Sequence, residues 1–191
     1  MKHFGILLTG TKYGKDIWKT DIAKVISRFK HMFVVYLPGY SKKNEEELKS
    51  FVACFKKNKI EFYAHRWNHW EHPEEENYEK FFEIEVPAII SALKEKDEIV
   101  FIGKSDGSRV AMKVIEEGGL SPQQIILMGL PLSKDREEKI KLYQRVLKKQ
   151  NCPIVIIQNN HDPYSSPEEV RNALTRSEEH TSELQSLRHL V

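Results

Sequence analysis

The chain has few of the features that mark specialised protein classes. Of its 191 residues, two are cysteines, nine are glycines and eight are prolines. Cys54 and Cys152 form no metal-binding or redox spacing, which is typical of a protein from a reducing compartment. The formal net charge of +2 gives no sign of a nucleic-acid surface. No apolar run approaches membrane-spanning length.

The remaining composition is that of one soluble globular domain, with 40% hydrophobic and 30% charged residues. The first residues, MKHFGILLTGTKYG, contain too short an apolar stretch for a signal peptide. We therefore expect a cytoplasmic protein that binds neither nucleic acid nor membrane. The sequence does not indicate its oligomeric state.

The most informative stretch is residues 98–117, EIVFIGKSDGSRVAMKVIEE. Its apolar run at 99–102 predicts a short buried strand, and the pattern at 110–115 predicts a helix that ends at Gly118. Between them lies a G-x-S-x-G motif centred on Ser105. A sharp strand-to-helix turn needs small residues around its tip and holds the serine Oγ clear of the backbone. The amide of Asp106 would then begin a helix, where free N–H groups favour a developing oxyanion.

Strands and helices are expected to alternate along the chain. The predicted strands are residues 4–8, 32–37, 59–67, 99–102, 124–128 and 153–157. The predicted helices are 15–30, 45–57, 78–94, the helix that follows Ser105, 135–149 and one starting at Pro167. Pro87 should kink or restart the third helix. Strands joined by crossover helices run parallel and are covered on both faces. The fold class is therefore α/β, a three-layer sandwich with a mostly parallel sheet of about six strands.

Asp162 is the candidate acid of a catalytic triad. A serine hydroxyl needs a base, usually a histidine that a carboxylate orients. Asp162 follows the strand that lies two strands after the one leading to Ser105. Ligands of such sheets bind at the carboxyl ends of the strands, where both residues are expected. The alternative is that Asp162-Pro163 is only a turn. His161 is unsuitable as the base, because it directly adjoins the acid.

A second oxyanion-binding amide should come from a loop after an earlier strand. Two loops could supply it. Tyr40, in the Pro38-Gly39-Tyr40 turn, precedes Ser105 by one helix, one strand, one helix and the strand that leads to Ser105, and it is the preferred candidate. Thr11, in the loop at Gly10, lies one strand and one helix further back and is the alternative.

Several segments together resemble the α/β-hydrolase fold. They are LPGY (37–40), HRWNHW (65–70), IGKSDGS (102–108), GLPL (129–132) and IIQNNHDPYSSPEE (156–169). The resemblance implies that Ser105 is the nucleophile, Asp162 the acid, and the amides of Asp106 and Tyr40 the oxyanion donors. It implies a small-molecule acyl substrate and no cofactor. Three features depart from the family: Pro38 replaces a common histidine, Asp106 adds a negative charge beside the nucleophile, and the triad histidine is missing.

The last sixteen residues match the translation of a common short-read sequencing adapter. They read RSEEHTSELQSLRHLV (176–191) and are interpreted as not native, which removes His180 and His189 from consideration.

Residues 1–175 would then be a single α/β-hydrolase-like domain that lacks its last strand and helix. The triad histidine is expected beyond Thr175, so the chain should be inactive as it stands. The strand at 153–157 would be an exposed edge. Residues 4–30 would be an extra strand-helix pair, or the first core unit with 59–67 inserted.

The loop HRWNHW, with His72 after it, offers a second group of functional side chains. His65, His69 and His72 do not repeat on one helix face, and no acidic or cysteine ligand completes a set, so no metal site is predicted. Trp67 and Trp70 could line an acyl or leaving-group pocket. Equally, the loop could simply fold over an apolar edge.

Two functions follow from these observations. The first is a serine hydrolase that cleaves a carboxylic ester or thioester through an acyl-enzyme on Ser105. The second is a non-catalytic binding or scaffold domain that keeps the hydrolase shape, which Pro38 and Asp106 motivate.

Overall fold

Six short, mainly apolar strands pair into one parallel sheet. The computed structural model describes residues 4–9, 29, 31–132 and 136–175. Across the sheet the strands follow the order β1 (Phe4–Thr9), β6 (Ile154–Asn159), β5 (Gln124–Met128), β4 (Ile99–Lys104), β2 (Phe33–Leu37) and β3 (Glu61–Ala64). Every neighbouring pair is parallel. The predicted fold class and the number of strands are confirmed.

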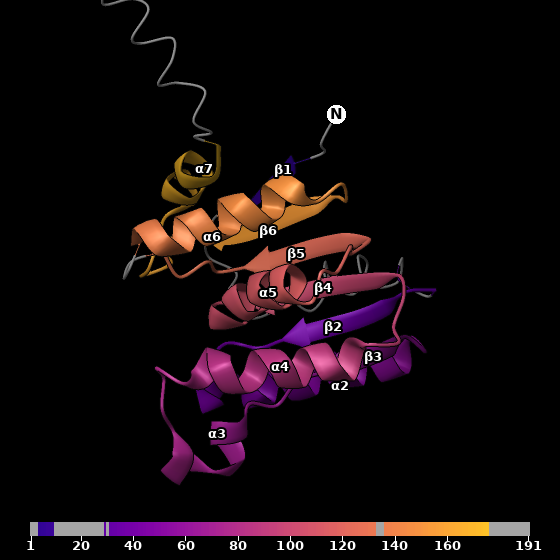
Figure 1. Cartoon of the computed structure of the whole chain (residues 1–191). Helices are drawn as coiled ribbons and strands as arrows, with labels where there is room; N and C mark the ends of the chain where they lie inside the picture. Colours follow the sequence, from indigo (N-terminus) through magenta and orange to yellow (C-terminus); the bar gives the residue numbers. More distant parts are fainter. Residues whose placement is uncertain (1–3, 10–28, 30, 133–135, 176–191) are drawn as a thin grey trace, which may run out of the picture.

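Helices cover both faces of this sheet. On one face α4 (Phe81–Leu93), α5 (Asp106–Glu117) and α6 (Arg136–Lys149) lie side by side, and α7 (Pro167–Thr175) follows beside α6 (Figure 1). On the other face α2 (Glu45–Lys57) places Phe55 5.2 Å from the ring of Phe62. The next residue of β3, Tyr63, turns to the α4 side, because successive residues of a strand point to opposite faces.

The position of β1 at one edge of the sheet decides between two alternatives and corrects one expectation. β3 is the edge strand beside β2, and β1 is the edge strand beside β6. The unit that begins with Phe4 is therefore an additional strand, not the first unit of the core. β6 pairs with β1 over six residues, from Phe4↔Ile154 to Thr9↔Asn159. The predicted exposed edge at 153–157 is thus covered, because β1 supplies its backbone partners.

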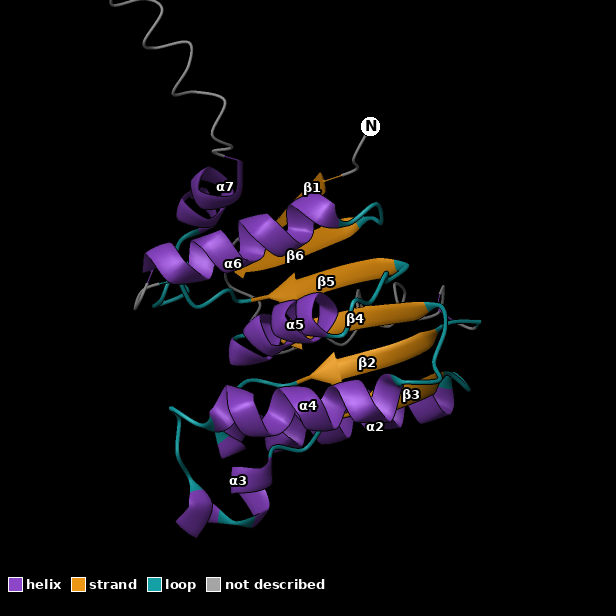
Figure 2. Ribbon diagram, viewed as in Figure 1, coloured by secondary structure: helices purple, strands orange, loops and turns teal. Residues whose placement is uncertain are grey.

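The strands direct their carboxyl ends to one side. The arrowheads of β2, β5 and β6 point the same way, and the loops that follow them gather there (Figure 2). Between β3 and α4 the chain leaves the sheet to form α3 (Asn68–Glu71) and η3 (Pro73–Glu75), while η2 (Lys42–Asn44) precedes α2. No helix in the described part of the chain has the length and apolar character needed to cross a membrane.

Candidate active site

Ser105 occupies a strained turn at the centre of the sheet. Its backbone angles are φ 50° and ψ −123°, at the junction of β4 and α5. A positive φ is costly for a residue with a side chain, and such strain persists only where the surroundings enforce it. One enforcing contact is a hydrogen bond from the Ser105 amide to the carbonyl oxygen of Met128, at 2.8 Å. The predicted strand–Ser105–helix arrangement is therefore present.

The two glycines of the motif allow the turn to pack. A Cβ atom on Gly107 would lie 2.1 Å from the carbonyl oxygen of Leu37 and 2.4 Å from that of Pro38. A Cβ atom on Gly103 would lie 2.7 Å from the Cα of Ser108. Because all of these neighbours are backbone atoms, neither position has room for a side chain. The first turn of α5 consequently lies directly against the loop after β2.

The hydroxyl of Ser105 is not engaged by its own helix. A serine at a helix N-cap usually accepts a hydrogen bond from an amide of the first turn. Ser105 is the N-cap of α5, yet its side chain makes no such bond. The nearby Ser108 hydroxyl is engaged instead, since its Oγ lies 2.5 Å from both the Ser105 carbonyl oxygen and the Tyr143 hydroxyl. The half-buried Ser105 Oγ is thus available for chemistry.

Asp162 follows β6 at the same edge of the sheet. One of its carboxylate oxygens, Oδ1, accepts hydrogen bonds from the amides of Tyr164 at 2.9 Å and Ser165 at 3.3 Å. The other, Oδ2, lies 3.4 Å from the position that a Cβ atom would take on Gly129, the residue after β5. Gly129 has φ +58°, which lets the chain turn closely beneath the carboxylate. Oδ2 makes no hydrogen bond to the described residues, so it can orient a further group.

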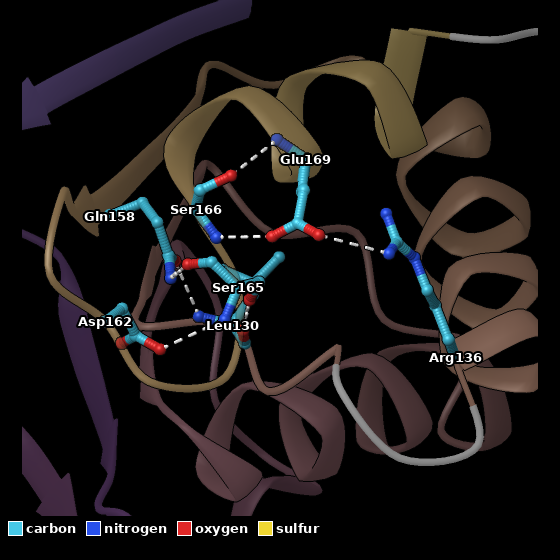
Figure 3. Close-up of polar contacts among 7 residues, drawn as sticks. All are labelled: Leu130, Arg136, Gln158, Asp162, Ser165, Ser166 and Glu169. Atoms are coloured by element: carbon cyan, nitrogen blue, oxygen red, sulfur yellow. Dashed lines mark hydrogen bonds and ion pairs between the residues drawn. The ribbon is translucent and has the colours of Figure 1, made fainter.

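Buried hydrogen bonds fix the loop that carries Asp162 (Figure 3). The fully buried Gln158 accepts a hydrogen bond from the amide of Leu130 and donates one to the carbonyl oxygen of Ser165, both at 2.8 Å. The Ser165 hydroxyl donates in turn to the Leu130 carbonyl oxygen at 2.5 Å. The loops after β5 and β6 are therefore joined into one unit.

The start of α7 closes the same loop. The amide of Ser166 donates to the carboxylate of Glu169 at 2.8 Å, and the Glu169 amide donates to the Ser166 hydroxyl at 3.2 Å. This is a capping box, which satisfies two free amides at a helix start. The Ser166 amide and the Arg136 guanidinium lower the pKa of the Glu169 carboxyl, with the Ser166 hydrogen bonds as the larger cause. Arg136 lies 3.3 Å from Glu169 (Figure 3).

The loop after β2 is held by aromatic side chains. The indole Nε1 of Trp67 donates to the carbonyl oxygen of Gly39 at 3.0 Å, and that of Trp70 donates to the carbonyl oxygen of Tyr40 at 2.7 Å. His69 Nε2 donates to the same Tyr40 oxygen at 2.9 Å, and the two rings stack at 4.2 Å. Tyr40 is consequently fixed beside the first turn of α5.

The two tryptophans differ from the expected pocket wall. Trp67 is 0% exposed and Trp70 1% exposed, so neither indole has surface with which to touch a bound acyl group. Each indole N–H donates a hydrogen bond to a carbonyl oxygen of the loop, because a buried indole needs a hydrogen-bond acceptor. In this arrangement they support the loop of Tyr40 and do not line a pocket.

The two candidates for the second oxyanion donor lie on different strands of the sheet. β2 is the direct neighbour of β4, and Leu37 is level with Gly103 in the register of the pair. β1, the strand before Thr11, is separated from β4 by β5 and β6. Thr11 itself lies outside the described residues. The order of the strands favours Tyr40.

Asp106 is paired in a way that the sequence interpretation missed. The Tyr78 hydroxyl donates to Asp106 Oδ1 at 2.9 Å, and the Arg109 guanidinium donates to the same oxygen at 3.1 Å. Arg109 also donates to the Tyr78 hydroxyl at 2.8 Å. The spacing of Asp106 and Arg109, three residues apart on a helix, is a signal that could have revealed this pair. Nothing local in the sequence points to Tyr78.

His65, the first histidine of the HRWNHW segment, is part of a buried hydrogen-bond network. His65 Nε2 donates to Glu85 at 2.7 Å, and its Nδ1 lies 2.6 Å from the Tyr63 hydroxyl. His65 and Glu85 are both buried, and the second oxygen of Glu85 accepts from the Asn68 amide at 2.8 Å. This network anchors the segment between β3 and α4. Within the described ranges, no three His, Cys, Asp or Glu residues are grouped so as to hold a metal ion.

A general base for Ser105 does not appear in the described part of the chain. None of its histidines is hydrogen-bonded to Ser105 or to the Asp162 carboxylate. His161 is exposed, and its backbone amide donates to Asn159. The predicted histidine beyond Thr175 and the excluded His180 and His189 lie outside the described residues.

Two comparisons with known proteins find similar proteins. A family profile described as "Alpha/beta hydrolase domain" matches residues 43–189, a range that runs on into the segment interpreted as adapter-derived. Among solved structures, the type II thioesterase BorB from the borrelidin biosynthetic cluster is similar, with 15% sequence identity and a TM-score of 0.49. The alignment covers 74% of this chain and 75% of that one. A search of curated protein sequences finds no significant match. Because the family profile matches most of the sequence, this chain belongs to the alpha/beta hydrolase domain family.

Proposed function

We propose that the protein is a serine hydrolase that cleaves a carboxylic ester or thioester of a small-molecule acyl substrate. The observation that carries this proposal is the backbone of Ser105, held at φ 50° between β4 and α5 with an uncommitted hydroxyl. A strained serine at the carboxyl edge of a parallel sheet is typical of an activated nucleophile. The Asp162 carboxylate, two strands along the same edge, supports the assignment.

In the proposed reaction, Ser105 Oγ attacks the carbonyl carbon of the substrate and transfers its proton to a general base. The negative charge that forms on the carbonyl oxygen is stabilised by the amides of Asp106 and Tyr40. Collapse of this intermediate breaks the bond to the leaving alcohol or thiol, which takes the proton of Ser105 from the base. Water then gives a proton to the base and attacks the acyl group on Ser105. The bond between the acyl group and Ser105 Oγ breaks, Oγ takes that proton, and the carboxylic acid leaves.

We propose a histidine outside residues 1–175 as the general base, with Asp162 as its orienting acid. The order serine, acid, histidine is that of the hydrolase fold. Sequencing the source gene past the codon for Thr175 tests this part. A further strand followed by a loop with a histidine would support it. If the gene encodes RSEEHTSELQSLRHLV instead, the interpretation of this tail as non-native is wrong and His180 and His189 become the candidates.

Covalent labelling tests the nucleophile directly. A fluorophosphonate probe on protein expressed from the complete gene should label the wild type and fail to label Ser105→Ala. Ser50→Ala is the matched control, because Ser50 is an exposed serine on α2, whose hydroxyl donates to the Glu46 carbonyl oxygen. Equal labelling of wild type and Ser105→Ala would refute the assignment.

A second candidate function is a non-catalytic binding or scaffold domain. The hydrogen bonds of Asp162 Oδ1 to two backbone amides favour it, because an aspartate that only stabilises a turn makes such bonds. This alternative predicts a folded full-length protein that hydrolyses no short acyl ester and has no histidine facing Ser105.

A further inference from the structure

Asp106 creates an electrostatic problem for the proposed reaction. Its amide is one of the two proposed oxyanion donors, but its side chain carries a negative charge at the same helix start. A carboxylate there is favourable for α5, since the first turn of a helix attracts negative charge. The same charge would oppose a second negative charge developing on the substrate oxygen.

Two hydrogen-bond donors, one of them a cation, contact one oxygen of this carboxylate. Arg109 and Tyr78 both donate to Asp106 Oδ1, and Arg109 also donates to Tyr78, so the three side chains form a closed triangle of hydrogen bonds. The Asp106 side chain is 16% exposed and that of Arg109 is 15% exposed. Solvent screens such a partly buried ion pair less than it screens a pair on the surface.

Neighbouring elements fix each member of the triangle. The Arg109 guanidinium lies over the ring of Phe82 on α4, 4.5 Å from its centroid, which is favourable for a cation. Tyr78 packs with its ring edge-on to Tyr40 at 4.9 Å, so it touches both the carboxylate and the loop after β2. Burial, followed by the Asp106 charge, raises the pKa of Tyr78 to about 12, so its hydroxyl remains a donor at neutral pH.

We propose that Arg109 and Tyr78 are positioning residues that neutralise and immobilise the Asp106 carboxylate, so that the Asp106 amide can bind an oxyanion. This inference rests on the proposed function. It explains how a chain with an acidic residue after its nucleophile can still stabilise negative charge at that point.

A double-mutant cycle on protein from the complete gene tests the proposal. The variants are Arg109→Gln, Asp106→Asn and the two combined, and the measured quantity is the acylation rate constant with p-nitrophenyl acetate. Arg109→Gln should slow acylation by roughly ten- to hundredfold, somewhat less than the loss of an oxyanion donor itself. Asp106→Asn removes the charge and keeps the amide, so the double variant should recover to within about threefold of the wild type. Tyr78→Phe should slow acylation in the same direction by a smaller factor.

Arg145→Gln is the matched control, because Arg145 on α6 pairs at 2.6 and 2.7 Å with Glu116, which lies in the last turn of α5, whereas Ser105 precedes the first turn. It should acylate at the wild-type rate. A double variant as slow as Arg109→Gln would overturn the proposal, because charge neutralisation predicts rescue and a merely structural role does not.

Urea unfolding of the same variants separates this failure from failure of the proposed function. The unfolding free energies of the single and double variants show whether Asp106 and Arg109 stabilise each other. If they do but the wild type is not acylated, the serine-hydrolase proposal fails and the pair is structural. If the wild type is acylated and no rescue occurs, only the role of Arg109 and Tyr78 is refuted.

Discussion

The backbone amide of Ser105 donates a hydrogen bond to the carbonyl oxygen of Met128, at 2.8 Å. The next residue, Gly129, donates its own amide to Ile157 at 2.9 Å, and the Asp162 carboxylate lies against Gly129. Backbone hydrogen bonds thus connect β4, β5 and β6 between the proposed nucleophile and the strand that precedes the proposed acid. The contact of the Asp162 side chain with Gly129 completes the connection.

Asp162 can be tested separately as an acid and as a turn residue. Asp162→Asn keeps an oxygen that can accept from the Tyr164 and Ser165 amides, but it loses the charge. We expect it to unfold at nearly the wild-type urea concentration while its acylation rate falls by on the order of 10²- to 10⁴-fold.

Asp162→Ala is the companion variant. It should lose about 1–2 kcal/mol of unfolding free energy as well, because the two amides lose their acceptor. Full activity of Asp162→Asn would assign Asp162 to the turn alone.

Gly107→Ala should destabilise the fold strongly. Its new methyl group would overlap the carbonyl oxygens of Leu37 and Pro38, which belong to backbone that cannot move independently. We expect a loss of about 3 kcal/mol or more in the free energy of unfolding, measured in urea. Gly39→Ala is the control, because the three atoms nearest to its methyl group would all belong to the Asn44 side chain, the first at 2.8 Å. Similar losses for both variants would contradict the close packing of the first turn of α5 against the loop after β2.

Gln158→Leu should separate the loops after β5 and β6. The substitution leaves the Leu130 amide and the Ser165 carbonyl oxygen buried without their partner, at a cost of about 2–4 kcal/mol of unfolding free energy. Gln150→Leu, at a half-buried site with one long bond of 3.4 Å to Val146, should cost much less. An equally small effect of the two substitutions would mean that the buried network contributes little.

Stability should decline in alkali as buried phenols ionise. Burial, followed by the charge of Glu85, raises the pKa of Tyr63 from 10.0 to about 12. The unfolded chain therefore releases this proton near pH 10, whereas the folded chain keeps it until about pH 12. The stabilisation is complete below pH 10 and is lost as the pH rises to 12.

Urea midpoints measured from pH 9 to pH 12 check this expectation. The urea midpoint of Tyr63→Phe should fall less steeply with pH than that of the wild type. Tyr164→Phe, which alters an exposed phenol, should show the same dependence of the midpoint on pH as the wild type. An unchanged slope for Tyr63→Phe would contradict the predicted ionisation.

The sequence predicted the parts of the fold that depend on local pattern. The apolar run before Ser105 and the glycines around it specified the sharp strand-to-helix turn at Ser105, because such a turn needs small residues around its tip. The alternation of strands and helices specified a parallel sheet covered on both faces. Pro87 was expected to kink or restart α4; the helix does not restart there but continues from Phe81 to Leu93, and a kink at Pro87 stays a prediction.

The remaining features depend on contacts between distant segments. The pairing of β1 with β6 leaves no periodic signal in either strand, so the covered edge could not be foreseen. Burial of Trp67 and Trp70 depends on carbonyl groups nearly thirty residues away. Likewise, the contact of Tyr78 with Asp106 spans 28 residues and requires the segment between β3 and α4 to fold back over α5.

The central claim is that Ser105 carries the acyl group during turnover. The most direct test mixes protein from the complete gene with a short acyl thioester, quenches in acid within the first turnover, and measures the intact and peptide masses. We predict a mass increase of one acyl group on the peptide that contains Ser105, and none in Ser105→Ala. Hydrolysis of the thioester at the same rate by Ser105→Ala, with no acylated peptide in the wild type, would contradict the account.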